Sequence, residues 1–225
     1  MAMTQALKSS DHQLKSAITD ELCWAPRVNA DQIGVAVTDG AVTLSGQVYT
    51  YPEKQAAVRA ARRVRGATAV ADEIVVQHEF GEMQDADIAR AAGLAFDRTV
   101  VVPAGSVTAT VHNHVITLAG TVDWQYQREE AQRAVATLPG VRGLHNTIAV
   151  APEAVVSPAE AKTEIMAALR RNAQVDADRI EVAVTGSQVT LLGALSSWAE
   201  CHQAEYTAWC ASGVTHVDNR LSITP

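Results

Sequence analysis

The stretch GAVTLSG at residues 40–46 returns twice along the chain, as HVITLAG at residues 114–120 and as SQVTLLG at residues 187–193. Each copy ends on a glycine, and the three glycines are 74 and then 73 residues apart. Repetition at a nearly constant period indicates a chain that is built from copies of one supersecondary unit. The sequence therefore predicts three consecutive copies, which we call modules 1, 2 and 3.

The agreement between the copies extends well beyond this motif. A second glycine follows the first after twenty residues in each copy, and a large aliphatic residue follows eight residues later. Large apolar residues also recur at three fixed distances before the first glycine. Chance does not produce such agreement at six positions in three copies. The first glycines are Gly46, Gly120 and Gly193, and the second glycines are Gly66, Gly140 and Gly213.

The first segment of each copy has helical periodicity. Apolar residues recur every three to four positions, which predicts an amphipathic helix with one buried face. In module 3, Ser157, Pro158 and Glu160 have the spacing of an N-cap, a first-turn proline and a capping-box acid. In module 1, Ser10 and Gln13 have the same spacing as the N-cap and the acid, so we expect that helix to begin at Ser10.

Two short β-branched segments follow, in which apolar residues alternate with others. This pattern is typical of a β-hairpin. The junctions between the two segments are residue types that tolerate the positive φ of a tight turn. They are Asp39-Gly40, Asn113-His114 and Gly186-Ser187.

A second helix then presents small apolar residues, among them Ala57, Ala131 and Ala204. We expect the second glycine to end this helix in a left-handed C-cap, and a last strand to complete the unit. The order is αββαβ over about 65 residues. The fold class is α+β, with two helices on a small mixed three-stranded sheet in each module. The modules span residues 10–77, 85–151 and 157–225.

Short linkers separate the modules, namely HEFGEMQ at residues 78–84 and APEAVVSP at residues 151–158. The first is polar with one glycine, and the second is bracketed by prolines. Because both are short, we expect the modules to lie close to one another.

The unit resembles the BON domain, a module named for osmotically inducible periplasmic proteins and nodulation proteins. The resemblance lies in the αββαβ order, in the V-x-L-x-G of residues 42–46, and in a closing G-V-x-x-V-x-N-x-[IL] at residues 213–221. Module 2 matches the closing motif at residues 140–148, whereas module 1 has Ala67 and Asp72 in place of the valine and the asparagine. The resemblance covers nearly the whole chain. It implies attachment to phospholipid membranes and carries no catalytic residues.

The composition excludes several classes of protein. A formal net charge of −7 argues against nucleic-acid binding, which requires a basic surface. None of the common motifs of hydrolases, nucleotide-binding proteins or metalloproteases is present, so we predict a non-enzymatic protein without a cofactor or a resident metal. The cysteines lack the spacing of a zinc site or a disulfide framework, and we expect small buried thiols. They are Cys23, Cys201 and Cys210.

His112, Asn113 and His114 allow three interpretations. The tripeptide could belong to a metal-dependent nuclease, or its histidines could form a weak metal site with His145. In register with the other modules, however, Asn113 and His114 occupy the hairpin turn, and the following helix lacks the further His or Asn that such a nuclease needs. We therefore favour the turn.

Two groups of residues are candidates for a membrane-binding surface. Four arginines follow one another in the second helix of module 1, where they share a face that could attract anionic lipid or could simply be solvated. Aromatic residues recur just after the first glycine, where they could lie at a lipid interface or pack the helix onto the sheet. Trp24 and Trp209 fall in helical segments, and we expect them to pack. The candidates are Arg59, Arg62, Arg63, Arg65, Tyr49, Tyr51, Trp124, Tyr126 and Trp198.

Together these features favour a binding or scaffolding protein that associates with a phospholipid membrane surface and is linked to osmotic or general stress. The alternative is an adaptor that binds another protein or an ion and never contacts lipid. The N-terminal residues lack the apolar segment of a signal peptide, which favours the cytoplasm, although exported proteins are common in this family.

Overall fold

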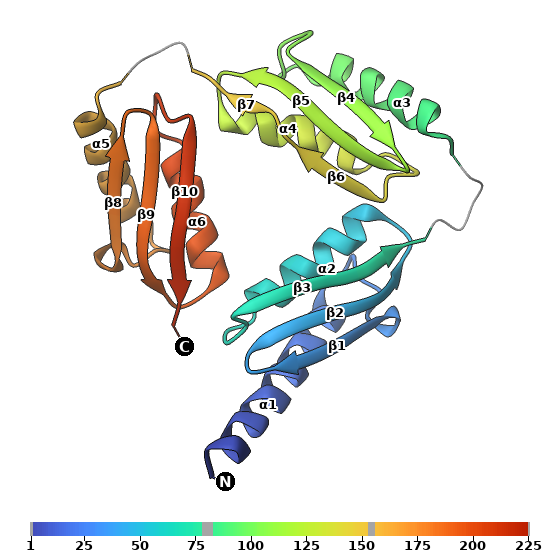
Figure 1. Ribbon diagram of the computed structural model, residues 1–225, viewed down its shortest axis with the longest axis vertical. Coiled ribbons are helices and arrows are strands. Elements are labelled where there is room, and N and C mark those ends of the chain that lie inside the picture. Colours follow the sequence, from blue (N-terminus) through green and yellow to red (C-terminus); the bar gives the residue numbers. More distant parts are fainter. Residues whose placement is uncertain (1, 78–82, 153–155, 225) are drawn as a thin grey trace. The chain divides into compact units, whose positions relative to one another are not determined.

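The computed structural model describes residues 2–77, 83–152 and 156–224, with side chains from Ser10 onward. Its elements repeat in the predicted order αββαβ (Figure 1). The predicted fold class, α+β with three repeated modules, is confirmed. The central parts of both linkers, residues 78–82 and 153–155, lie outside the described residues.

The three modules have matching helices and strands. Module 1 contains α1 (Ala2–Trp24), η1 (Ala30–Gln32), β1 (Ile33–Thr38), β2 (Ala41–Val48), α2 (Tyr51–Arg63) and β3 (Ala69–Val76). Module 2 contains α3 (Asp85–Arg98), β4 (Val107–His112), β5 (Val115–Val122), α4 (Gln125–Ala136), β6 (Gly143–Asn146) and β7 (Ala149–Val150). Module 3 contains α5 (Pro158–Arg171), η2 (Ala177–Arg179), β8 (Ile180–Thr185), β9 (Gln188–Leu195), α6 (Trp198–Trp209) and β10 (His216–Ile223).

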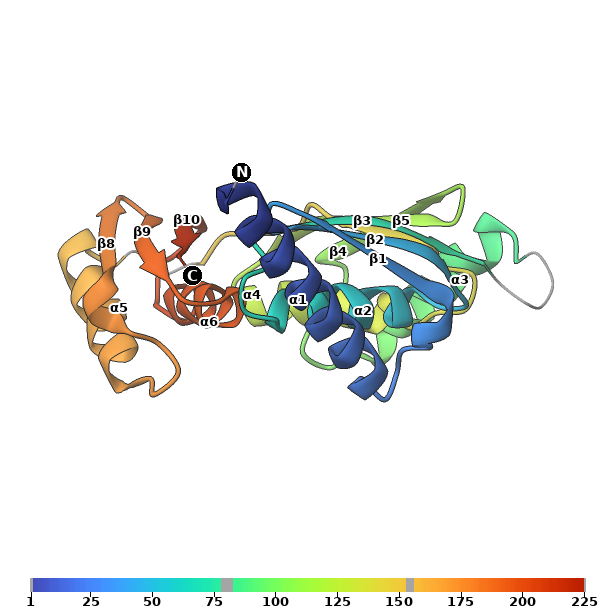
Figure 2. The same cartoon turned by 90° about the horizontal axis from the view of Figure 1, so that it is seen from below.

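Each module has one mixed sheet whose central strand is the second strand of the hairpin. In module 1 the order is β1-β2-β3, with β1 antiparallel and β3 parallel to β2. The parallel pairing requires a crossover connection, and α2 provides it. Modules 2 and 3 have the same arrangement, except that the last strand of module 2 is divided into β6 and β7. The two helices of a module cover one face of its sheet (Figure 2).

The core of each module lies between this face and the helices. The leucine of the TLxG motif is fully buried in the central strand of each module, at Leu44, Leu118 and Leu191. The alanines of the second helix, Ala57, Ala131 and Ala204, are also fully buried. Small side chains at these positions let the helix approach the sheet closely, which explains why the sequence keeps them small.

The first glycine of each module is required by a close contact between two backbone segments. Gly46, Gly120 and Gly193 have φ values of 117°, 137° and 144°, which favour glycine. A Cβ atom on Gly46 would lie 2.1 Å from the carbonyl oxygen of Gln32, and the corresponding distances in modules 2 and 3 are 2.0 and 2.1 Å. These glycines lie within the central strand, two residues before its end.

Two predictions about helix ends are wrong in detail. The first helix begins at Ala2, so Ser10 lies inside it and is not its N-cap. Gly66, Gly140 and Gly213 do have positive φ, but the second helices end three or four residues before them, so these glycines form the following turn and not the cap itself. The predicted capping box of Ser157 and Glu160 is confirmed, with the serine Oγ accepting the backbone N–H of Glu160.

Candidate functional site

The four arginines of module 1 are exposed at the C-terminal half of α2 and in the turn that follows it. Arg59, Arg62 and Arg63 belong to α2, whereas Arg65 lies beyond its end. Arg63 donates from Nη2 and Nε to Glu21 Oε1 at 2.7 and 3.0 Å, and thereby bridges α2 to α1. The charge of Arg63, which we predicted to be available to an external anion, is therefore neutralised within the module.

Arg59 has a different environment. The pKa of Arg59 is lower than its usual value. The main cause is partial burial of the guanidinium, and the nearby positive charges of Arg63 and Arg27 contribute less. Arg27 lies in the loop between α1 and β1, 32 residues before Arg59, and only the fold brings the two charges together. We call Arg27, Arg59 and Arg63 the arginine cluster. Sequence analysis missed Arg27, because nothing in the local pattern of this loop distinguishes it.

The aromatic residues do not share one environment. Tyr51, the first residue of α2, is buried, and its hydroxyl accepts a hydrogen bond from Gln55 at 3.1 Å. Burial, together with the negative charge of Asp72, raises the pKa of Tyr51. For this residue the structure supports the packing interpretation. The others remain at the surface to different degrees: Tyr49, Trp124 and Tyr126 are exposed, and Trp198 is half-buried.

The two tryptophans that were expected to pack behave differently from each other. Trp209 is half-buried against the core of module 3, as predicted. Trp24 is 83% exposed, so its prediction is wrong. Leu14, Ile18 and Leu22 form the buried face of α1, and Trp24, two residues after Leu22, lies on the opposite face of the helix. Trp24 is three residues from Arg27.

In each module, a carboxylate or amide side chain in the first turn of the second helix accepts hydrogen bonds from backbone N–H groups near the start of that helix. In module 1, Glu53 accepts the backbone N–H of Tyr49 at 3.2 Å and that of Asn29 at 2.9 Å. Gln127 binds the N–H groups of Asp123 and Trp124 in module 2. These residues could have been recognised in the sequence by their constant position, seven residues after the first glycine of each module.

The same position in module 3 is Glu200, which accepts the N–H groups of Asp176 and Ser196. Although partial burial acts in the opposite direction, these hydrogen bonds lower the pKa of Glu200. An internal carboxylate thus occupies the start of α2 and α6. An external phosphate near this end of module 1 would therefore bind to arginine side chains and not to the helix N-terminus.

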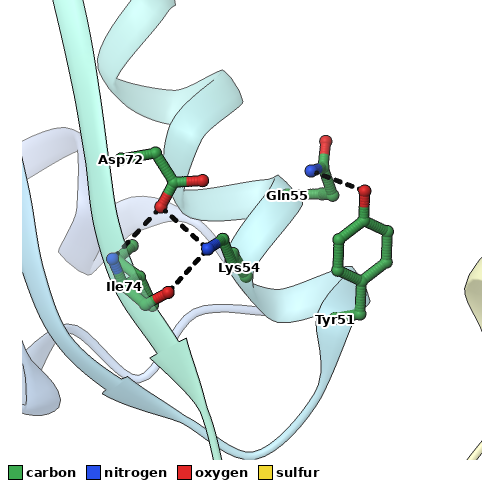
Figure 3. A network of polar contacts seen from close by, with 5 residues as sticks. All are labelled: Tyr51, Lys54, Gln55, Asp72 and Ile74. Carbon is green, nitrogen blue, oxygen red and sulfur yellow. Dashed lines mark hydrogen bonds and ion pairs between the residues drawn. The ribbon is translucent and has the colours of Figure 1, made fainter. Parts of the chain in front are cut away.

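Lys54 is occupied by a network at the edge of the sheet (Figure 3). Its Nζ donates to the carbonyl oxygen of Ile74 at 2.6 Å and lies 3.3 Å from Asp72 Oδ1, which also accepts the N–H of Ile74 at 3.1 Å. Because β3 is an edge strand, these contacts satisfy outward-facing backbone groups of Ile74. Lys54 therefore does not add to the arginine cluster.

In modules 2 and 3, the residue that corresponds to Asp72 is an asparagine. Asn146 and Asn219 accept the N–H two residues later at 3.1 Å, as Asp72 does. Asn146 also donates from Nδ2 to the carbonyl oxygen of Arg128 on α4, at 3.1 Å. A carboxylate cannot donate, so in module 1 the ammonium of Lys54 supplies the contact between helix and strand that the asparagine supplies elsewhere.

His112, Asn113 and His114 form the hairpin turn, as favoured by the sequence. Asn113 and His114 have φ values of 50° and 64°, the left-handed conformation of a two-residue hairpin. His114 Nδ1 lies 3.2 Å from the carbonyl oxygen of Gly140, which can only accept, so this nitrogen is the donor. Within the described residues, no three side chains of the metal-binding types gather in a way that could hold a metal ion.

The cysteines are divided between core and surface. Cys201 is buried as expected, and this burial raises the pKa of its thiol. Cys23 and Cys210 are exposed, so the expectation of buried thiols is wrong for these two. Cys210 follows the last residue of α6.

Among the described helices, none combines the length and the apolar character that crossing a membrane requires.

Comparisons with known proteins agree with this architecture. The family model of the BON domain matches residues 10–78, 84–152 and 157–225. Osmotically-inducible protein Y of Escherichia coli (strain K12) is 28% identical over 144 residues, which cover 60% of this chain and 68% of that protein. CdsD, a structural protein of the type III secretion system of Chlamydia trachomatis, is 11% identical, with a TM-score of 0.28 over 95% of this chain and 93% of that one. A likeness of this size supports no statement about function. The family-model matches leave only short segments uncovered, and the chain belongs to the BON domain family.

Proposed function

We propose that the chain is a non-enzymatic protein of the osmotic or general stress response that binds anionic phospholipid surfaces through module 1. Membership of the BON family and the similarity to an osmotically inducible protein support the link to stress. The observation that carries the lipid proposal is the arginine cluster, together with the exposed side chain of Trp24, three residues before Arg27.

Two hydrogen bonds join the loop that carries Arg27 to the end of β2. Glu53 binds the backbone of both Tyr49 and Asn29, so the end of β2 and the loop that carries Arg27 lie at the same end of the module. Tyr49 is 45% exposed and Trp24 is 83% exposed. Aromatic rings favour the headgroup region of a bilayer, where one part of the ring is apolar and the other is hydrated. The surface thus offers both phosphate-binding cations and interfacial side chains.

The net charge of −7 makes a local patch necessary, because an anionic bilayer repels the chain as a whole. Each arginine near an anionic surface contributes about 1 kcal/mol, and this attraction decreases over a Debye length. Binding should therefore be weak at neutral vesicles, stronger at anionic ones, and sensitive to salt.

Co-sedimentation with vesicles of phosphatidylglycerol or phosphatidylcholine at low salt tests the proposal. We expect the wild-type protein to sediment with phosphatidylglycerol only. The variant Arg27→Gln/Arg59→Gln should bind about tenfold or more weakly, from the loss of about 2 kcal/mol. Arg133→Gln is the matched control, because Arg133 has the position of Arg59 in module 2 and pairs with Glu130. It should leave binding unchanged.

Each result has a distinct meaning. Wild-type protein that stays in solution with both kinds of vesicle at low salt would contradict the proposal and favour an adaptor that binds another protein. Binding that is equal in wild type and in Arg27→Gln/Arg59→Gln would retain the membrane but exclude the arginine cluster.

A further inference from the structure

Module 3 contains a groove of about 520 Å³ along its two helices. Small or buried apolar residues line its middle, including Ile165 and Ala168 of α5 and Ala211 just after α6. The hydroxyl of Thr207, which also lines the groove, donates to the carbonyl oxygen of Gln203 at 2.8 Å and so presents no unsatisfied polar atom. A volume of this size is within the range of small-molecule sites.

The groove lies where module 1 has an ion pair. In register, Ala168 and Cys210 correspond to Glu21 and Arg63, whose side chains join α1 to α2. Replacement of two long side chains by two short ones removes the bridge and leaves the space between the helices open. Because an open apolar surface forgoes packing contacts, a bound apolar group would restore them.

The charged residues of the groove are arranged along its length. Glu164 and Arg171 both line it and both belong to α5. Seven residues of helix separate them by about 10 Å. The groove is therefore cationic at one end and anionic at the other, with an apolar middle. This pattern complements an elongated molecule that has a hydrocarbon chain and a single negative end.

We propose that this groove binds a medium-chain fatty acid, with the hydrocarbon chain against Ile165 and Ala168 and the carboxylate at Arg171. This site is in module 3, and its occupation does not depend on the binding of module 1 to vesicles. Arginine suits the carboxylate, because its guanidinium presents paired N–H donors that match the two oxygens. Glu164 disfavours the reverse orientation by repelling the carboxylate.

Cys210 provides a direct probe, because it is exposed and lines the groove. In a Cys23→Ser variant it is the exposed thiol of the described residues, since Cys201 is buried. We expect octanoate to slow the maleimide reaction of Cys210 about tenfold when the ligand is at ten times its Kd. In the converse Cys210→Ser variant, the reaction of Cys23 should be unchanged. Equal rates for Cys210 with and without octanoate would overturn the proposal.

A second variant closes the groove by design. Ala168→Glu/Cys210→Arg transfers the ion pair of module 1 into module 3, and we expect it to abolish octanoate binding in titration calorimetry. The control is Ala95→Glu/Thr137→Arg, which installs the same pair at the corresponding positions of module 2 and should leave binding intact. Should the charged variant fail to fold, as checked by circular dichroism, Ala168→Leu fills the groove instead. Full binding by the folded closed variants contradicts the assignment.

The headgroup is tested separately. Arg171→Gln should weaken octanoate binding about tenfold or more, since a hydrogen bond to a charged partner is lost. The trimethylammonium amphiphile of equal chain length should bind more weakly than octanoate to the wild-type protein. Equal binding of both amphiphiles, or no effect of Arg171→Gln, would show that the carboxylate is not held at Arg171.

Discussion

Asp85 holds the backbone of His114. The carboxylate of Asp85, the first residue of α3, accepts the N–H of His114 at 2.9 Å, and its other oxygen accepts the N–H of Asn113 at 2.8 Å. The same contact recurs in module 1, where Asp11 binds the N–H groups of Asp39 and Gly40. A tripeptide that suggested metal chemistry is therefore a turn that is tied to the first helix of its module.

Module 3 lacks this contact for a reason that its sequence explains. The residue in register with Asp85 is Pro158, which has no carboxylate. Its hairpin turn also differs, because Gly186 has positive φ whereas Ser187 does not. Instead, the hydroxyl of Ser187 lies 2.8 Å from that of Thr215. The carboxylate thus accompanies the turns in which both residues adopt the left-handed conformation.

The first prediction concerns Asp85→Asn. We expect the variant to lose protection of the amides of Asn113 and His114 in hydrogen exchange and to have a lower Tm, because a neutral amide is a weaker acceptor than a carboxylate. Asp87→Asn is the control, since the carboxylate of Asp87 pairs with the exposed Arg90 of the same helix. Unchanged exchange at Asn113 and His114 would show that the contact does not hold the turn.

The second prediction concerns acid. The hydrogen bond from the backbone N–H of His114 lowers the pKa of Asp85 below its ordinary value of 3.8. Desolvation opposes this shift, and the hydrogen bond from the N–H of Asn113 adds to it. Between the folded and the unfolded pKa of Asp85, the unfolded chain therefore binds more protons than the folded chain. The stabilisation by Asp85 is present above about pH 4 and is lost as the pH falls through the folded pKa. The Tm difference between wild type and Asp85→Asn should shrink from about pH 5 to about pH 2.5. A difference that grows toward low pH contradicts this account.

The third prediction compares a glycine of the repeated motif with a glycine inside a helix. Gly46→Ala places a Cβ atom 2.1 Å from the carbonyl oxygen of Gln32 at a φ of 117°, and should cost about 2–4 kcal/mol of unfolding free energy. Gly93→Ala meets nothing within 4 Å and lies inside α3. It should stabilise module 2 by up to about 1 kcal/mol through helix propensity. Urea denaturation measures both, and similar effects of the two substitutions would refute the steric argument.

The fourth prediction concerns the edge of the sheet in module 1. Lys54→Met should destabilise the protein by about 1 kcal/mol, because the carbonyl of Ile74 loses its donor and Asp72 loses its partner. Adding Asp72→Asn should recover part of this loss, since an asparagine can donate to the helix as Asn146 does in module 2. A double-mutant cycle of unfolding free energies measures the coupling. Additive effects of the two substitutions would exclude the proposed compensation.

Most of the architecture could be predicted from local patterns. The period of the TLxG motif, the turn residues such as Asn113 and Gly186, and the alternation of apolar residues depend on neighbours within one element, so they are visible in the chain. Helix ends were less well predicted. The start of α1 at Ala2 depends on how far the helix extends past the sheet, which local spacing does not encode. The exposure of Trp24 follows from its place two residues after Leu22, on the opposite face of the helix.

The candidate sites show the same division. The three modules, their mixed sheets and the arginines of one helix could be predicted from the sequence. The pairing of Arg63 with Glu21, the place of Arg27 beside Arg59 and the groove at Ala168 and Cys210 emerge only in the folded chain. Charge pairing and open volume depend on distances between elements far apart in the chain, which local patterns do not contain. A repeated motif determines the elements, but the side chains that meet between them determine what each module can bind.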